Sequence, residues 1–221
     1  MDFLPTYKHI VNTKLKNIYL SVNADGEIVV RSPRVSLESI ERLIVSKSNW
    51  INKAKEKIIL KKGKAEFSNG NLTIFYLGKK VDIVLQEARK NKIDFVEDEF
   101  TLFFTRRCAD MFHKTIDKFY LERAKLTLPI IVEKWSNVME LKPTRLKFRK
   151  TKTQWGSCNS KNEIQLNSSL MKLPPHLIDY VIIHELCHIK HKHHQKGFWE
   201  AVEVYCPEHK RCRKQLKEFT T

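Results

Sequence analysis

The stretch that decides the fold is VIIHELCHIKHKHH, from Val181 to His194, where an apolar run leads into closely spaced histidines. It contains the pattern His-Glu-x-x-His at His184, Glu185 and His188. Residues four apart in an α-helix project from the same face, so both imidazoles can bind one Zn2+. The carboxylate between them is then placed to polarise a water molecule on the ion. The pattern predicts a metal-binding helix with His184 and His188 as ligands and Glu185 as the catalytic group.

The two helical histidines leave the third ligand open. A catalytic zinc ion usually has three protein ligands and one open position. The first candidate is His194, which on a continuing helix would lie about 9 Å beyond His188 along the axis. We therefore expect the helix to end near Lys190 and the chain to fold back. The alternatives that the sequence leaves open are His191, His193, Glu200 and Glu203.

The residues before and after this helix predict further helices and short strands. Apolar spacing from Phe112 to Phe119 predicts one helix, and Pro129 suits the first turn of a second helix that ends before Pro143. Pro174-Pro175 suits the start of the histidine helix. The remaining predictions for this half are strands at 145–150 and 163–167 with a turn at 159–162, and a last helix at 198–205. We expect 163–167 to be the edge strand along which an extended substrate pairs.

The first hundred residues are richer in strand signals. Asp25-Gly26 predicts a hairpin between strands at 17–22 and 27–31. Ser36 suits the N-cap of a helix whose apolar residues recur from Ile40 to Ile58. Four more strands are predicted at 72–77, 80–85, 92–96 and 100–104. Because strands and helices occur in blocks, we expect an α+β fold, with a β-rich region at 1–104 and a catalytic domain at 105–221.

Composition limits the class of protein. The 221 residues contain 42% hydrophobic residues and no apolar run of the length that a membrane helix needs. The start lacks an apolar secretory core, and five irregularly spaced cysteines fit reduced thiols, so we expect a cytoplasmic protein. The net charge of +16 admits a nucleic-acid partner. Since the charges are spread along the chain, we favour a lysine-rich solvated surface.

The sequence around the histidines resembles a known family. HELCHIKHKHHQKGFW, at 184–199, is similar to the zinc-site signature of the YgjP-like metallopeptidases, which are relatives of the SprT-like proteins. Upstream, QWGSC at 154–158, IQLN at 164–167 and DYVI at 179–182 also resemble that family. The early hairpin and the turn at Gly78 are similar too, so the resemblance covers nearly the whole chain.

The resemblance implies a zincin-like core, in which the metal helix packs against a small sheet, plus a β-rich N-terminal portion. It places the third ligand at His194 and the catalytic carboxylate at Glu185. The family usually has Arg where this chain has Gln154, and a small residue where it has Gln195. No cation is therefore expected at position 154.

The activity that we expect is hydrolysis of peptide bonds by a zinc-dependent metallopeptidase acting on proteins or peptides. Two alternatives remain, a metal-dependent nucleotide phosphohydrolase and a nucleic-acid-binding protein with a structural zinc. A donor for the oxyanion is also expected. Its candidates are Tyr180, His176 and His193.

Overall fold

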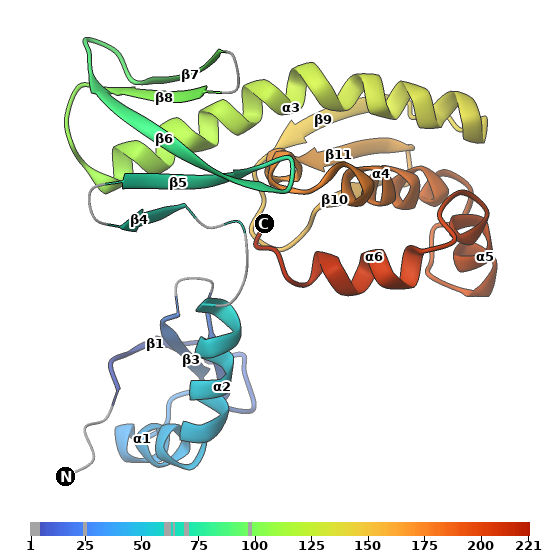
Figure 1. The fold of residues 1–221 in the computed structure, drawn as a ribbon. Coiled ribbons are helices and arrows are strands. Elements are labelled where there is room, and N and C mark those ends of the chain that lie inside the picture. The colour runs from blue at the N-terminus through green and yellow to red at the C-terminus, as the bar shows by residue number, and fades with distance from the viewer. Residues whose placement is uncertain (1–4, 24–25, 60–62, 64, 69–70, 97–98) are drawn as a thin grey trace. The chain divides into compact units, whose positions relative to one another are not determined.

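The computed structural model describes residues 5–23, 26–59, 63, 65–68, 71–96 and 99–221. The chain forms two compact units, which we call the N-terminal unit, 1–61, and the C-terminal unit, 62–221. Within the described ranges the fold is mixed α/β, with six α-helices and three small sheets (Figure 1).

The N-terminal unit is a three-stranded sheet covered by two helices. Its strands are β1 (Tyr7–Val11), β2 (Tyr19–Val22) and β3 (Ile28–Ser32), in the order β1-β3-β2. β2 and β3 form the predicted antiparallel hairpin, while β1 runs parallel to β3 and was not predicted. Two residues of the predicted turn, 24–25, lie outside the described residues.

The helix predicted after Ser36 is two helices, α1 (Leu37–Ser46) and α2 (Ser48–Ile59). Ser36 is the N-cap, as predicted, and its hydroxyl accepts a hydrogen bond from the Ser39 amide at 3.3 Å. A straight helix over both segments would be roughly 35 Å long, about twice the length of a five-residue strand. The break at Lys47 lets apolar residues of both helices share one small core. That core contains Ile28, Val30, Ile40, Ile44 and Ile51.

The first half of the C-terminal unit is a five-stranded sheet. Its strands are β4 (Glu66–Ser68), β5 (Asn71–Tyr76), β6 (Lys79–Glu87), β7 (Lys92–Val96) and β8 (Glu99–Phe104), in the order β4-β5-β6-β8-β7. All neighbours are antiparallel except β6 and β8. The four strands predicted between 72 and 104 are thus present.

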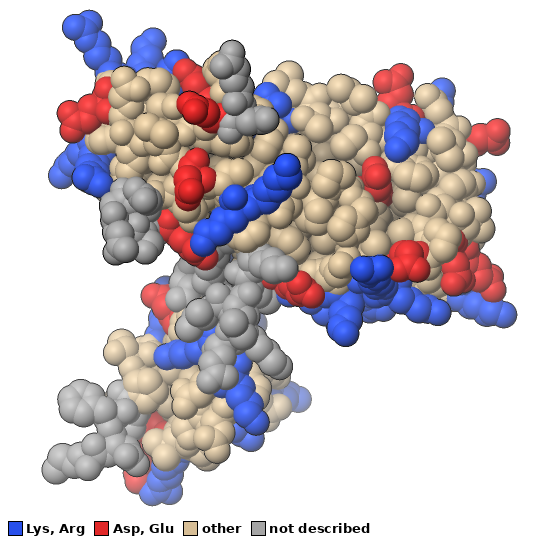
Figure 2. All heavy atoms as spheres, in the orientation of Figure 1, with Lys and Arg blue, Asp and Glu red and all other residues tan. Residues whose placement is uncertain are grey.

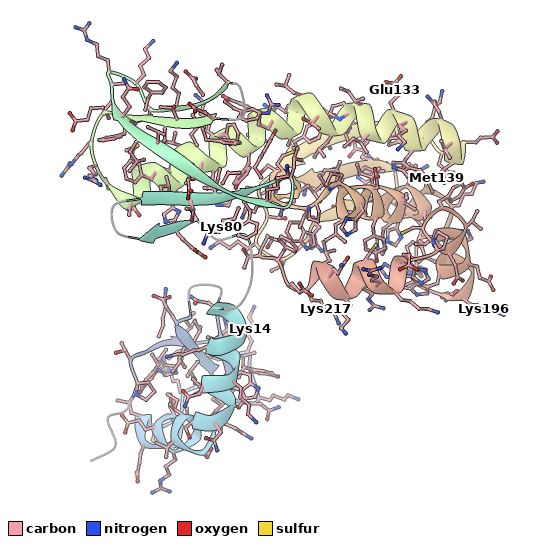
Figure 3. The ribbon with its side chains drawn as sticks, viewed as in Figure 1. Lys14, Lys80, Glu133, Met139, Lys196 and Lys217 are labelled. Atoms are coloured by element: carbon pink, nitrogen blue, oxygen red, sulfur yellow. The ribbon has the colours of Figure 1, made fainter. Side chains whose placement is uncertain are left out.

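One helix, α3 (Ala109–Met139), spans the whole C-terminal unit (Figure 1). The prediction of two helices divided at Pro129 was wrong, because Pro129 lies inside this 31-residue helix. An internal proline costs about 3 kcal/mol. Burial of apolar side chains on both sides of it, from Phe112 to Met139, offsets this cost. Met139 faces the interior whereas Glu133 points outward (Figure 3).

The position of α3 explains why 62–221 form a single compact unit. Near its start, Phe119 packs edge-on against Phe100 of β8, with ring centroids 5.8 Å apart. Further along, α3 contacts the elements that follow it. One hydrophobic core therefore contains residues from Leu72 to Phe219.

The second half of the C-terminal unit carries a three-stranded sheet. Its strands are β9 (Arg145–Arg149), β10 (Gly156–Cys158) and β11 (Glu163–Asn167), in the order β10-β11-β9. The expectation that 163–167 is an edge strand was wrong, because β11 lies between β9 and β10. The edge strands are β9 and the short β10.

Four helical segments complete the unit. They are the 3-10 helix η1 (Ser168–Lys172), α4 (Pro175–Lys190), α5 (Lys196–Tyr205) and α6 (His209–Leu216). Pro175 is the first residue of α4, as predicted. Helix α6 was not predicted. α4 contacts β10 on one side and α3, α5 and α6 on others (Figures 1 and 3). The histidine helix is therefore the centre of this half of the unit.

Candidate metal centre

The predicted metal helix is α4, which is almost wholly buried. Its apolar residues from Leu177 to Cys187 belong to the core, whereas His184 and His188 are only partly buried. Core packing fixes the rotation of the helix about its axis. That rotation in turn fixes the direction in which the two imidazoles project.

The helix ends at Lys190, where the chain was expected to fold back. His191 leaves the helical conformation, with φ −119° and ψ 95°. Its carbonyl oxygen lies 2.9 Å from Nδ1 of His188, so that nitrogen donates to the turn. Nε2 of His188 is thereby left as the atom that can bind a metal.

The turn brings His194 back to the two helical histidines. Its Nε2 atom lies 3.1 Å from Nε2 of His188 and 3.1 Å from Nε2 of His184. All three nitrogens lie within 4.8 Å of one another. Tetrahedral zinc with bonds of about 2.0–2.1 Å places its ligand nitrogens roughly 3.3–3.4 Å apart. The three side chains therefore fit one divalent ion.

The other candidates for a third ligand do not join this group. Among the described residues, the cluster of possible ligands comprises only His184, His188 and His194. Glu200 instead pairs with Lys196, with Nζ and Oε1 3.6 Å apart.

Two aromatic side chains of α5, Trp199 and Phe198, contact the exposed imidazole of His194. The ring of Trp199 is stacked on it, with centroids 5.6 Å apart and an interplanar angle of 24°. His209 of α6 stacks in turn on Trp199, with ring centroids 5.7 Å apart and an interplanar angle of 21°. Phe198 meets His194 edge-on at 4.7 Å. These contacts orient a side chain that belongs to no helix.

A lysine also fixes the loop that carries His194. Lys192 donates from Nζ to the carbonyl oxygen of Asn159 at 3.2 Å and to the side chain of Asn162. Both partners lie in the turn between β10 and β11, which was predicted at 159–162. The loop after α4 is thus held by the small sheet on one side and by Trp199 on the other.

Glu185 is buried beside this cluster, with 5% of its surface exposed. Its Oε2 atom is buried and has no hydrogen-bond partner among the described residues. Burial raises the pKa of the carboxyl group to about 8. An unsatisfied buried carboxylate oxygen is costly, so the position fits a group that exchanges protons with a ligand.

A cavity of about 200 Å³ opens onto Glu185. It is lined by Gln154, Trp155, Gly156, Tyr180, Val181, His184, Glu185 and Leu216. Gly156 leaves room for the carboxylate, because a Cβ atom at this position would lie 2.8 Å from Oε1 of Glu185. A glycine within a strand often marks such a close approach. The glycine of the QWGSC motif is therefore a sequence signal for this contact, which we did not predict.

The imidazoles of His184 and His188 are held in the form that binds metals. Burial, and then the charges of His188, His194 and Arg213, lower the pKa of His184 to about 3. The pKa of His188 is also lowered, mainly by burial. Metal ligation requires neutral imidazole, so no proton has to be displaced from these two side chains near neutral pH.

The structure separates the three candidates for an oxyanion donor. Tyr180 lines the Glu185 cavity, and burial raises its pKa to about 12, which keeps its hydroxyl protonated. Nε2 of His176 lies 3.0 Å from Oε1 of Gln215, and His176 lines only a second cavity, of about 520 Å³, which Tyr180 lines as well. His193 is exposed and lines neither cavity.

Three convergent imidazoles beside a buried carboxylate define a candidate site of a metal-dependent hydrolase. The profile of the YgjP-like metallopeptidase domain matches residues 16–219, and the chain belongs to this family. It is therefore a metallopeptidase, whose substrate is a peptide or protein and whose reaction requires a catalytic metal. This confirms the family that the histidine motif resembles.

Two solved structures show a weaker likeness. One is the metallopeptidase zymogen abylysin of Pyrococcus abyssi, with 22% identity and a TM-score of 0.37, covering 41% of this chain and 91% of its own. The other is the zymogen jannalysin of Methanocaldococcus jannaschii, with 21% identity, a TM-score of 0.37, and coverage of 40% and 91%. At these scores neither structure informs the interpretation of the site.

No curated protein matches the chain. Within the described residues, no helix is both long and apolar enough to cross a membrane.

Proposed function

We propose that the chain is a zinc peptidase with a zincin-like core, in which His184, His188 and His194 hold the ion and Glu185 is the general base. The observation that carries this proposal is the convergence of three Nε2 atoms next to a buried carboxylate. Three neutral imidazoles suit zinc better than the hard cations Mg2+ and Ca2+, which prefer oxygen ligands. The three also leave one tetrahedral position for water or substrate.

When bound, zinc lowers the pKa of a water molecule to about 7 and polarises the carbonyl group of the substrate. Glu185 accepts the proton of the attacking water and then passes it to the leaving amine nitrogen. Burial raises the pKa of this carboxyl group, so its carboxylate form is a stronger base than that of an exposed glutamate. We assign to Tyr180, which lines the Glu185 cavity, the hydrogen bond from its hydroxyl group to the oxyanion.

The edge strand β10 is the surface on which we place the substrate backbone. β10 pairs with β11 on one side, and no strand of the described ranges pairs with its other side. An extended peptide can add there through main-chain hydrogen bonds. Gly156 lies in this strand and against Glu185, so such a peptide would pass the proposed base.

The test is Glu185→Gln, with the exposed Glu203→Gln on α5 as the matched control. Both variants are loaded with zinc and analysed for metal content, thermal unfolding and cleavage of a broad protein mixture by mass spectrometry. We expect both to keep zinc, and only the Glu185 variant to lose cleavage. Cleavage by that variant at the wild-type rate would show that Glu185 is not the base.

A further inference from the structure

One face of α6 is directed at the proposed metal centre. Leu216 lines the Glu185 cavity, and His209 is buried with its ring stacked on Trp199. Residues at positions i, i+4 and i+7 share one face of a helix. Arg213 is four residues after His209 and three before Leu216, so it lies on that face.

The guanidinium of Arg213 lies over the indole that supports the site. Its Cζ atom is 5.2 Å from the ring centroid of Trp199. The same indole is stacked on His194 and lies 5.9 Å from the ring of His184. The positive charge of Arg213 contributes in the lowering direction to the pKa of both His184 and Tyr180. Arg213 therefore contacts the indole ring that itself neighbours two of the three proposed ligands.

Arg213 has no acidic partner in the parts of the chain that the structure describes, and it is exposed. The neighbouring Arg211 is different, because its Nη1 atom lies 3.6 Å from a carboxylate oxygen of Glu208. Imidazole ligands bring no negative charge to a divalent ion. An anionic group of a ligand near Arg213 would therefore be attracted both by the guanidinium and by the ion.

We propose that Arg213 binds a carboxylate of the peptide substrate, so that the enzyme prefers peptides with a carboxylate close to the scissile bond. This inference rests on the proposed peptidase function. The planar fork of a guanidinium matches the two oxygens of a carboxylate. Lys and Arg side chains also gather along the α6 side of the C-terminal unit, where 210–217 contains five of them (Figure 2). Such a surface attracts acidic peptides.

A carboxylate can come from an Asp or Glu side chain or from the C-terminus of the peptide. The first arm uses a neutral peptide that the wild-type enzyme cleaves, with a single Glu or Gln moved along the positions on both sides of the cleaved bond. The second arm compares a free C-terminus with an amidated one. We expect the carboxylate form to be preferred about tenfold in kcat/KM in one arm, between the values for exposed and buried ion pairs.

The variant is Arg213→Met, which keeps an apolar stem over Trp199 and removes the charge. Arg211→Met, two residues away and paired with Glu208, is the matched control. We expect Arg213→Met to lose the preference while it keeps zinc and still cleaves the neutral peptide. Arg211→Met should keep the preference.

An unchanged ratio between carboxylate and neutral peptides in Arg213→Met would overturn the inference, and so would an equal loss on both peptides, which indicates a packing role. Release of phosphate from nucleoside triphosphates that depends on Arg213 would also overturn it and identify phosphate as the anion. If zinc-loaded wild-type enzyme cleaves no peptide, the proposed function fails, and the inference fails with it.

Discussion

Gly156→Ala tests the contact between the edge strand and the proposed base. A Cβ atom at this position would lie 2.7 Å from Cγ, 2.8 Å from Oε1 and 2.9 Å from Cδ of Glu185. Ordinary van der Waals contacts are 3.4–4 Å, so the two groups must separate by about 0.6 Å. No φ in the left-handed region adds strain at Gly156, so the obstacle is this overlap alone.

The displacement falls on the carboxylate or on β10. Glu185 is buried and has little room to change its side-chain conformation, and β10 is held by its pairing with β11. Overpacking of this kind costs about 1–3 kcal/mol of stability. A catalytic group misplaced by about 1 Å can lose about 100-fold in rate. We therefore expect kcat/KM to fall between about 10-fold and 100-fold, with normal zinc content.

The assay compares peptide cleavage, zinc content and thermal unfolding of Gly156→Ala with those of Gly197→Ala. At position 197 a Cβ atom would meet only the ring of His191, at 3.7 and 3.8 Å, which are ordinary contacts. This control should keep its activity within about twofold and gain roughly 0.5 kcal/mol of stability. Wild-type kcat/KM in Gly156→Ala would refute the reasoning that Glu185 acts from its position in this structure.

Two further predictions concern other side chains of the C-terminal unit. Trp199→Leu removes the ring stacked on His194, so zinc affinity measured by chelator competition should fall about 10-fold or more, and Trp199→Phe should restore most of it; equal affinity in the Leu variant would contradict the supporting role of the ring. Lys172 is 9% exposed, and burial lowers its pKa from 10.5 to about 8. The unfolded chain therefore binds more protons between these values, so the free energy of unfolding should rise from about pH 8 to about pH 10.5. Lys172→Met should remove this rise and stabilise the protein at pH 7 by up to about 3 kcal/mol, as measured by urea unfolding; identical pH profiles would refute the prediction.

Strands and helix termini were predicted well where the signal is local. The hairpin before Ser36, the cap at Ser36 and the start of α4 at Pro175 depend on side chains within a few residues of the feature. Pro129 shows the limit of local signals. Its preference for a first helical turn was overridden by core packing on both sides, which the sequence around it does not reveal.

The order of strands was equally inaccessible from sequence. The pattern at 163–167 predicts a strand but does not show whether neighbours lie on one side or both. β10, with only three residues, is too short to give a clear pattern, yet it is the edge strand beside Glu185.

The sequence by itself determined the pair His184 and His188 with Glu185 between them, because a helical repeat of 3.6 residues places them without help from the rest of the chain. Only the tertiary structure brought His194, of the five candidates, to the two helical imidazoles, placed Gly156 against Glu185 and brought Arg213 onto Trp199. Each of these contacts joins different elements, whose separation in space depends on how sheets and helices pack. Local geometry therefore gives two of the three proposed ligands, and packing decides the third together with the surroundings in which it acts.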